Sequence, residues 1–460
     1  MIPGRKLTFI RIFFFSMGLA ALLCHLFPAW AFATDNSNPP APVETEKPVP
    51  AVSAWYEKID ADWGGRLRTS GFVSWTDNET IYAPVGTGTF FDGSANLRLT
   101  NETFFTDSIY TEVHYELIGA AGDSIEKQNE LEELFPGLPD NLYFPGAPLN
   151  DDRRLVDLTG IITEENSWFL LQRLDRLYVA LLPQWGSLRI GRQAITWGNG
   201  LVFNPIDLFN PFSPTAIDRD YKVGDDMINA QFGLPDVGDM QLLYVARRDP
   251  DTENVEFDQA STAAKLHVAA GTTEFDVMAS RHYKDYVAGL GTRGYLKDAA
   301  WRADATWTVL NDGSDYLSVV ANIDYSWVWF ERNFYGFIEY FFNGLGKDDY
   351  SEALRDPDIT ERLARGELFV LGKNYLSANI QVEIHPLVKL TLSAINNIED
   401  PSGILQPYLT WDILQDLQLT CGANVYYGSK GSEYGGFRIP GTDLRNKPPN
   451  SAYLWLIYYF

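Results

Sequence analysis

Segments in which apolar and polar side chains alternate residue by residue recur along most of this chain. In residues 109–117, Val113 and Leu117 lie on one face of the alternation, and Glu112 and Glu116 lie on the other. The pattern recurs at residues 274–282, 301–309, 376–383 and 417–427. A β-strand shows this period when one face meets an apolar medium and the other meets water. The pattern therefore predicts amphipathic strands, which occur both in soluble sandwiches and in membrane barrels.

Reading every such segment predicts about 18 strands, and a count of 16 is also compatible with the pattern. An even count returns the last strand to the side on which the first begins. The expected strands are residues 65–75, 90–104, 108–119, 173–183, 187–196, 226–233, 239–248, 262–270, 272–283, 286–295, 299–309, 315–328, 333–343, 373–384, 387–397, 403–413, 416–427 and 450–460.

The connections between these strands sort by length onto two sides. Links from an even-numbered to an odd-numbered strand are short turns, such as Phe105-Thr106-Asp107 and His385-Pro386. The odd-to-even links include every long one, and the longest are residues 120–172, 197–225, 344–372 and 428–449. Outer-membrane barrels have short periplasmic turns and long external loops, whereas a soluble sandwich has no reason to sort its loops. The sequence therefore predicts an all-β fold, a transmembrane antiparallel up-and-down β-barrel, with those four links as long external loops.

The apolar content is distributed as a barrel requires. Aromatic residues make up 14% of the chain, yet no stretch after residue 34 approaches the roughly 18 apolar residues of a membrane helix. A barrel spreads its apolar surface over alternate positions of many strands, which reconciles the two observations. Trp75, Tyr115, Trp327 and Tyr427 fall near expected strand ends, where they suit either an interfacial girdle or ordinary packing.

The N-terminus has the features of a secretory signal peptide. Arg5, Lys6 and Arg11 accompany an apolar stretch, and Ala31-Phe32-Ala33 forms a small-x-small cleavage site. An uncleaved anchor helix is the alternative, but the apolar run is short for one. The expected organisation is a signal peptide over residues 1–33 cleaved near Ala33, a proline-rich periplasmic tether over 34–62, and the barrel over 63–460.

Charge and cysteine content exclude several kinds of site. The formal net charge is −25, and loss of residues 1–33 lowers it to −28 because they hold three basic and no acidic residues. Nucleic acid binds basic surfaces, so no nucleic-acid partner is expected. The acidity suits either hydrated loops alone or a pore biased toward cations. Only Cys421 follows the cleavage site, so neither an intramolecular disulfide nor a cysteine metal cluster is expected, and no metal site or cofactor is predicted.

The C-terminal strand, residues 452–460, places Leu454, Leu456, Tyr458 and Phe460 on one face. It resembles the closing strand of bacterial outer-membrane barrels, which commonly ends in phenylalanine and is recognised by their assembly machinery. The resemblance implies that this machinery is a partner through Phe460, and that outer-membrane lipid and lipopolysaccharide surround the barrel. The implied localisation is the outer membrane of a Gram-negative bacterium.

A second segment resembles known barrels more locally. Gly191-Arg192-Gln193, followed by Trp197-Gly198, is similar to the strand-then-loop of porin-like barrels, including alginate-export-type and uncharacterised outer-membrane families. The Asn-Pro pairs that follow force extended or turn conformations. This loop is therefore expected either to fold into the lumen as a constriction or to fasten itself to the barrel wall. No face of residues 188–193 stays apolar, which predicts a bulge near Gly191 or an inward turn.

The polar faces of the strands and this loop supply the candidates for pore lining or constriction. Charges of both signs on one wall are typical of a water-filled pore. Such residues can instead pair with each other across neighbouring strands. The candidates are Arg189, Arg192, Gln193, Asn204, Asp207, Glu112, His114, Glu116, Arg302 and Asp304. Further inward-facing charges are expected at Arg66, Arg68, Arg98, Glu102, Lys265, Glu274, Asp276, Glu339 and Glu383. If the loop forms a constriction, Arg189, Arg192 and Gln193 would offer planar donors to anionic or polyhydroxylated solutes.

These observations predict an outer-membrane channel, a porin-like transporter for small polar or charged solutes. The alternative is the outer-membrane component of an export or lipid-trafficking assembly. A barrel-borne hydrolase is a minor alternative, because His282 lies close to Asp285 near a strand end. The chain has no Gly-x-Ser-x-Gly, HExxH, phosphate-loop or dinucleotide motif, so no catalytic residue is assigned. A short helix is expected over Ser124 to Phe135, and the sequence leaves open whether the barrel forms a homo-oligomer.

Overall fold

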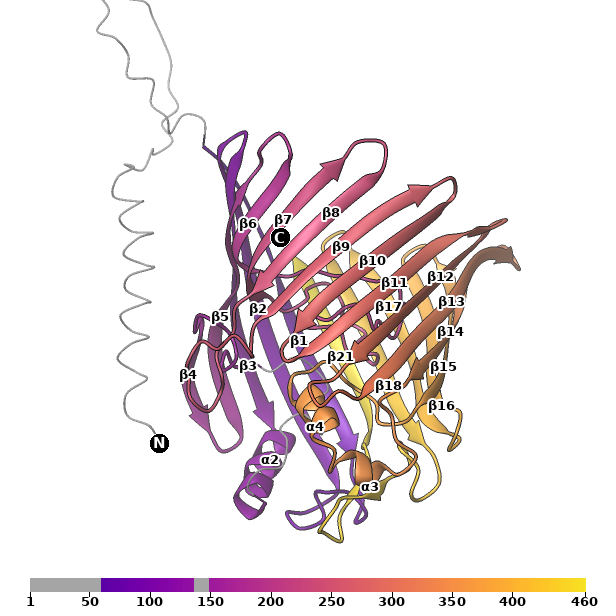
Figure 1. Ribbon diagram of the computed structural model, residues 1–460. Helices are drawn as coiled ribbons and strands as arrows, with labels where there is room; N and C mark the ends of the chain where they lie inside the picture. The colour runs from indigo at the N-terminus through magenta and orange to yellow at the C-terminus, as the bar shows by residue number, and fades with distance from the viewer. Residues whose placement is uncertain (1–58, 136–148) are drawn as a thin grey trace, which may run out of the picture. The chain divides into compact units, whose positions relative to one another are not determined.

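The computed structural model describes residues 59–135 and 149–460. The expected signal peptide, residues 1–33, and residues 34–58 of the expected tether lie outside the described residues. Lys58–Phe460 forms one compact unit, in which the strands follow one another around a barrel (Figure 1). No helix in the described part is long and apolar enough to cross a membrane.

Eighteen strands form the barrel wall, and each pairs antiparallel with its neighbours along the wall. They are β1 (Asp60–Trp75), β2 (Thr89–Thr106), β3 (Ile109–Gly122), β5 (Trp168–Leu181), β6 (Gly186–Gln193), β7 (Asp225–Leu234), β8 (Gly238–Val245), β9 (Ser261–Ala270), β10 (Thr273–His282), β11 (Asp285–Leu296), β12 (Ala299–Val309), β13 (Asp315–Trp329), β14 (Arg332–Asn343), β15 (Asn374–His385), β16 (Val388–Asn397), β17 (Ser402–Leu414), β18 (Leu417–Tyr427) and β21 (Asn450–Tyr459). The last strand pairs with the first, from Tyr459 opposite Arg66 to Asn450 opposite Trp75. The predicted all-β, antiparallel up-and-down barrel of about 18 strands is therefore confirmed.

The wall is apolar outside and polar inside. On β10, Phe275 and Val277 are 39% and 50% exposed, whereas Asp276 between them is 6% exposed. On β11, Tyr286 and Leu290 are exposed in the same way. Exposed apolar side chains and buried charges reverse the arrangement of a soluble protein. They fit a wall with lipid outside and a polar lumen inside.

Large aromatic side chains gather near the short turns. Trp329 stacks on Phe330 with ring centroids 4.6 Å apart. Trp327 stacks on Phe334 at 5.4 Å. Trp329 and Phe330 are exposed, and broad rings with an apolar body suit the level at which lipid tails give way to headgroups.

Several shorter elements lie in the long links. The helix predicted over Ser124 to Phe135 is present as α2 (Asp123–Leu134), and Leu131 packs it against Ile81 and Phe90. The link between β14 and β15 holds α3 (Tyr350–Ala353) and α4 (Pro357–Ala364), and the link before β21 holds the ribbon of β19 (Phe437–Arg438) and β20 (Arg445–Asn446).

Besides the short ribbon of β19 and β20, one further strand was not expected. β4 (Thr159–Glu165) pairs with β5 from Thr159 opposite Arg173 to Glu165 opposite Trp168. It lies within residues 120–172, which were expected to be an external loop, and it extends the sheet along the part of β5 that β6 does not reach. The sequence did not reveal β4 because Ile161 and Ile162 are adjacent and break the alternation.

Of the two alternatives predicted for residues 188–193, the bulge near Gly191 is absent. The ladders of β6 with β5 and β7 run through Gly191 without a register shift. Gly191 has a φ of +127°, and a Cβ there would lie 2.2 Å from the carbonyl oxygen of Leu177, so close strand approach requires glycine. The bulge lies in β5 at Asp175, where the register with β3 shifts between His114 and Tyr115.

Candidate functional site: a constriction across the lumen

The link between β6 and β7 runs into the barrel. Residues 197–225 were predicted as a long link on the external side, with the alternatives that it folds into the lumen or fastens to the wall, and in the structure the link folds inward and contacts the wall. Its side chains and backbone contact inward-facing residues on β1, β12, β14, β17 and β21. Because those strands lie on distant parts of the wall, the segment crosses the lumen. Residues 197–225 are named the constriction loop.

The constriction loop is first fastened to β12. The carboxylate of Asp304 accepts hydrogen bonds from the backbone N–H of Asn199 at 2.6 Å and from its side-chain amide at 2.8 Å. Asp304 is 1% exposed. A buried carboxylate is stable only when donors surround it, so this contact fixes the start of the loop.

A second carboxylate on β14 holds the next turn. Glu339 accepts the backbone N–H groups of Leu201, Val202 and Phe203 at 2.6, 3.0 and 2.8 Å. The ring of Phe203 stacks on Phe341 with centroids 4.4 Å apart. A side chain that satisfies three backbone donors fixes the loop's path because those donors lack partners within the loop itself.

An apolar cluster supports this half of the loop from the wall. Trp197, Ile206 and Phe209 pack with buried side chains of β7 to β11, among them Met227 and Met278. Trp197 is 2% exposed, and its indole N–H donates to Gln241 at 2.6 Å. The cluster fills one side of the lumen with side chains, so this part of the loop serves as a plug against the wall.

The far end of the loop meets β1 through ion pairs. Asp218 contacts Arg66 at 3.2 Å and also pairs with Arg68, and Asp220 contacts Arg66 at 2.8 Å. The ring of Tyr221 lies under the guanidinium groups of Arg66 and Arg98, at 4.7 and 4.2 Å. Negative side chains of the loop therefore lie against positive side chains of β1, where the loop reaches the opposite side of the lumen.

The bulge in β5 adds a dense charged cluster beside this contact. It turns Arg173, Asp175 and Arg176 all toward the interior, where each is no more than 7% exposed. Arg98 bridges Glu116 at 2.8 Å and Asp175 at 2.9 Å. The three β5 residues were missed in the sequence because a bulge interrupts the period of two on which an inward assignment depends.

Two of the predicted constriction residues, Arg192 and Gln193, hold parts of the wall and of the link before β5 together. Arg192 contacts Asp151 and Asp226, each at 2.9 Å, and is 2% exposed. The amide of Gln193 donates to the carbonyl of Met227 at 3.3 Å. Arg192 therefore joins the link before β5 to β7, and Gln193 joins β6 to β7, so neither side chain holds the constriction loop itself.

Two more predicted residues lie in the constriction loop and stabilise its fold. Asn204 donates to the carbonyl of Trp197 at 2.7 Å. Asp207 pairs with Lys222 at 2.6 Å. Burial raises the pKa of Asp207 and lowers that of Lys222, so each depends on the other to remain charged.

Three of the remaining candidates are brought together on β3. Glu112 lies 3.0 Å from His114, which contacts Arg98 at 3.1 Å, and Glu116 joins the same cluster through Arg98. Arg302 lies apart from them and pairs with Asp324 on the next strand. Arg189 is half-buried, with its guanidinium 5.9 Å from the ring of Tyr178. Contact of any of these candidates with a solute remains a prediction.

A closed wall with an apolar exterior, a polar interior and a loop across the lumen defines the architecture. The fold is that of a closed antiparallel β-barrel. Solved structures with a similar fold include OccK7 (OpdD) of Pseudomonas aeruginosa, with a TM-score of 0.48 and 9% identity over 87% of this chain and 99% of that chain. OccAB1 of Acinetobacter baumannii has a TM-score of 0.48 and 10% identity over 89% and 98%.

A BenF-like porin from Pseudomonas fluorescens Pf-5 is similar to the same degree, with a TM-score of 0.48 and 10% identity over 88% of this chain and 99% of that chain. No protein-family model matches the chain, and no curated protein matches it. The resemblance at such low identity concerns the fold alone.

Proposed function

We propose that this protein is a porin-like channel of the Gram-negative outer membrane that passes small polar or charged solutes. A barrel of this strand number leaves an aqueous lumen unless loops fill it. The observation that carries the proposal is the constriction loop, which is fastened to β12 and β14 at one end and to β1 at the other. A narrow polar passage of this kind admits small hydrated solutes and retards large ones.

The charges at the far end of the loop would bias which solutes pass. Arg66 and Arg68 on β1 face Asp218 and Asp220 on the loop. A solute moving past this contact experiences a field between fixed charges of opposite sign. Charged and zwitterionic solutes would therefore be oriented there, whereas apolar solutes would gain no such interaction.

The route to the membrane belongs to the same proposal. The signal peptide would be removed near Ala33, and the long links would face the exterior. The backbone of Phe460 pairs with Gly65 on β1, with N···O distances of 2.8 and 3.1 Å. The C-terminal residue thus takes part in closure of the barrel, which fits a role as a signal for the assembly machinery.

The channel proposal carries no enzymatic activity. The Asp–His pair suggested by His282 and Asp285 is not formed, because His282 contacts Glu367 at 3.0 Å and Asp285 pairs with Arg362. Ser261 contacts His282 at 3.0 Å but is 1% exposed, so substrate would not reach its hydroxyl. This cluster instead joins the α4 link to the wall.

Deletion of residues 199–215 tests the proposal in planar bilayers. Single-channel conductance should rise, because the plug and its anchors to β12 and β14 are removed while the wall remains. A matched deletion of residues 251–256, in the link between β8 and β9, should leave conductance unchanged. Equal conductance in the two deletions would reject the constriction. Absence of both ion current and liposome swelling in the intact protein would favour the export or lipid-trafficking alternative.

A further inference from the structure

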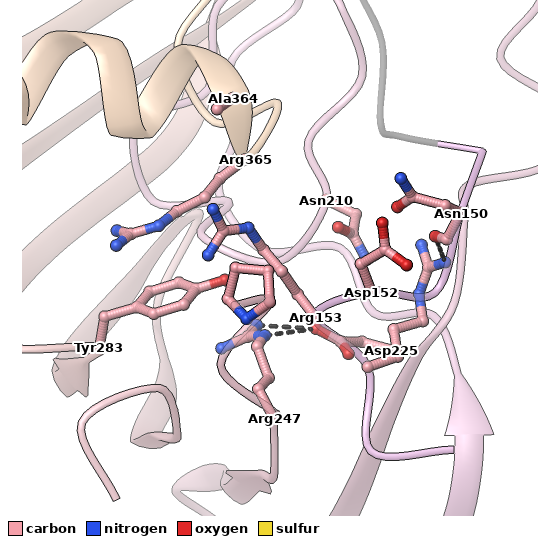
Figure 2. Close-up of a pocket in the computed structure, with 11 residues that line it drawn as sticks. Asn150, Asp152, Arg153, Asn210, Asp225, Arg247, Tyr283, Ala364 and Arg365 are labelled. Carbon is pink, nitrogen blue, oxygen red and sulfur yellow. Dashed lines mark hydrogen bonds and ion pairs between the residues drawn. The ribbon is translucent and has the colours of Figure 1, made fainter. Parts of the chain in front are cut away.

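A pocket of about 200 Å³ lies where the constriction loop runs into β7, beside the end of α4 (Figure 2). Four arginines, Arg153, Arg154, Arg247 and Arg365, line it together with two aspartates, Asp152 and Asp225. The lining itself carries two more positive than negative side chains, although Asp151 and Glu361 just outside it pair with Arg154 and Arg365. A local excess of guanidinium groups in an acidic protein indicates a site for an anion.

Two of the four arginines are fully occupied by the fold. Arg154 contacts Asp151 at 2.5 Å and donates to the carbonyl of Gly224 at 3.0 Å. Arg247 contacts Asp225 at 2.7 Å and donates to Ser261 at 2.7 Å. Arg154 and Arg247 therefore serve the structure of the pocket wall, and Arg153 and Arg365 are the two arginines that could bind a ligand.

Arg365 is held in place but not fully satisfied. Its guanidinium lies 3.7 Å from the centroid of the Tyr283 ring, and it donates to Glu361 at 2.6 Å. Its side chain is only 9% exposed, yet its Nε–H has no partner among the described residues. Among the described residues its side chain donates only from Nη2 to Glu361, so Nη1 can still donate to a ligand oxygen in the pocket.

Arg153 offers the second free group. Its side chain makes no hydrogen bond or ion pair within the described part of the chain, whereas its carbonyl accepts the N–H of Arg248 at 3.0 Å and so fixes its backbone. Figure 2 shows the Arg153 side chain pointing toward the side on which Arg365 and Tyr283 lie. Asp249 acts on Arg153 only through space, since its carboxylate accepts hydrogen bonds from Thr252 and Gln259.

We infer that this pocket binds a small oxyanion, a dicarboxylate or a phosphate, between Arg153 and Arg365. Planar guanidinium groups match the paired oxygens of such anions, and Arg remains charged at any physiological pH. Asn210 of the constriction loop also lines the pocket, so a bound anion would sit beside the entrance to the passage. The role of the site as a capture point before the constriction rests on the proposed function, but the binding itself does not.

Isothermal titration calorimetry of the full mature chain in detergent tests the inference, with succinate and inorganic phosphate as separate probes. At least one should bind, and the neutral analogue succinamide should not. Arg153→Gln should weaken anion binding at least about tenfold, which corresponds to a loss of about 1.4 kcal/mol in binding free energy. Because Arg153 has no partner in the described part, this variant should retain the fold. Arg355→Gln, which removes an exposed arginine between α3 and α4, is the matched control and should bind as the parent does.

The contrary outcomes are distinct. Equal affinity of the parent and Arg153→Gln, or no binding of either anion, would overturn the site. Arg365→Gln gives an independent check and should weaken binding. Its control is Glu361→Gln, which removes the charge of the carboxylate that pairs with Arg365 and should leave anion affinity undiminished. If the protein binds anions but does not conduct ions, the channel proposal is rejected and the anion site is retained. If it conducts ions but binds no anion, the anion site is rejected and the channel proposal is retained.

Discussion

The carboxylate of Glu339 on β14 accepts the backbone N–H of Phe203 at 2.8 Å, although 136 residues separate the two in the chain. The same carboxylate holds the N–H groups of Leu201 and Val202. A single inward side chain therefore fixes the place at which the constriction loop meets the wall. The position of the passage depends on this contact more than on the residues of the loop alone.

Glu339→Ala should release this turn and enlarge the passage. It leaves three backbone donors without their acceptor, at a cost of about 1–3 kcal/mol for each group that finds no water. Single-channel recordings should show a higher mean conductance with more frequent fluctuations. The control is Glu383→Ala on the adjacent strand β15, because the side chain of Glu383 contacts Asn333 near the short turns. Its recordings should match those of the parent protein. Identical records from both variants would contradict the anchoring role.

Asp218→Asn should shift the selectivity of the channel toward anions. Burial raises the pKa of Asp218, but the charges of Arg68 and Arg66 lower it by more. This carboxylate is therefore charged at neutral pH. Its removal leaves the two guanidinium groups less balanced where the loop meets β1. The reversal potential in a potassium chloride gradient should move in the anion direction, while Asp312→Asn in an exposed link should not move it. A shift in the cation direction would refute the assignment.

The α4 link should open in acid. Burial opposes ionisation of Glu367, but the charge and hydrogen bond of His282, together with Arg365 and Arg362, lower its pKa to about 2. Since the folded pKa lies below the unfolded value, the contribution of Glu367 to stability is present above about pH 4.5 and is lost as pH falls toward 2.

Limited proteolysis of residues 344–373 across this pH range measures that opening. Cleavage should be slow at neutral pH and should accelerate between about pH 4.5 and 2. Glu367→Gln should be cleaved faster at neutral pH and should show a flatter pH profile. A variant with the parent's profile would show that another group controls the link.

Gly191→Ala should destabilise the barrel, whereas Gly71→Ala should not. A Cβ at residue 191 would lie 2.2 Å from the carbonyl oxygen of Leu177 and would require a φ of +127°, whereas nothing lies within 4 Å of the corresponding position at residue 71. The strained backbone alone costs about 1–3 kcal/mol. The unfolding of both variants can be followed in urea by the electrophoretic band that the folded barrel gives without heating. Equal unfolding midpoints for the two variants would contradict the close approach of Leu177 to residue 191.

The strands themselves were predictable because the evidence for a strand is local. Whether Val277 points to lipid and Asp276 to the lumen depends on the polarity of each residue and on the fixed period of two. Where that period fails, prediction failed as well: the bulge at Asp175 and the adjacent isoleucines of β4 both interrupt it. The inward charges Arg66, Arg98 and Glu339 were identified by alternation, but their partners were not.

By itself the sequence determined the wall, its inner and outer faces and the side on which its long links lie, because each of these follows from side-chain polarity and chain length. The sequence singled out the link after Gln193 as a candidate constriction, and only the tertiary structure decided that this link enters the lumen and where it is held. Asp304 and Glu339 bind residues more than a hundred positions away, and such pairings have no local signature, since an inward carboxylate looks the same whether it meets water, an arginine or a backbone N–H.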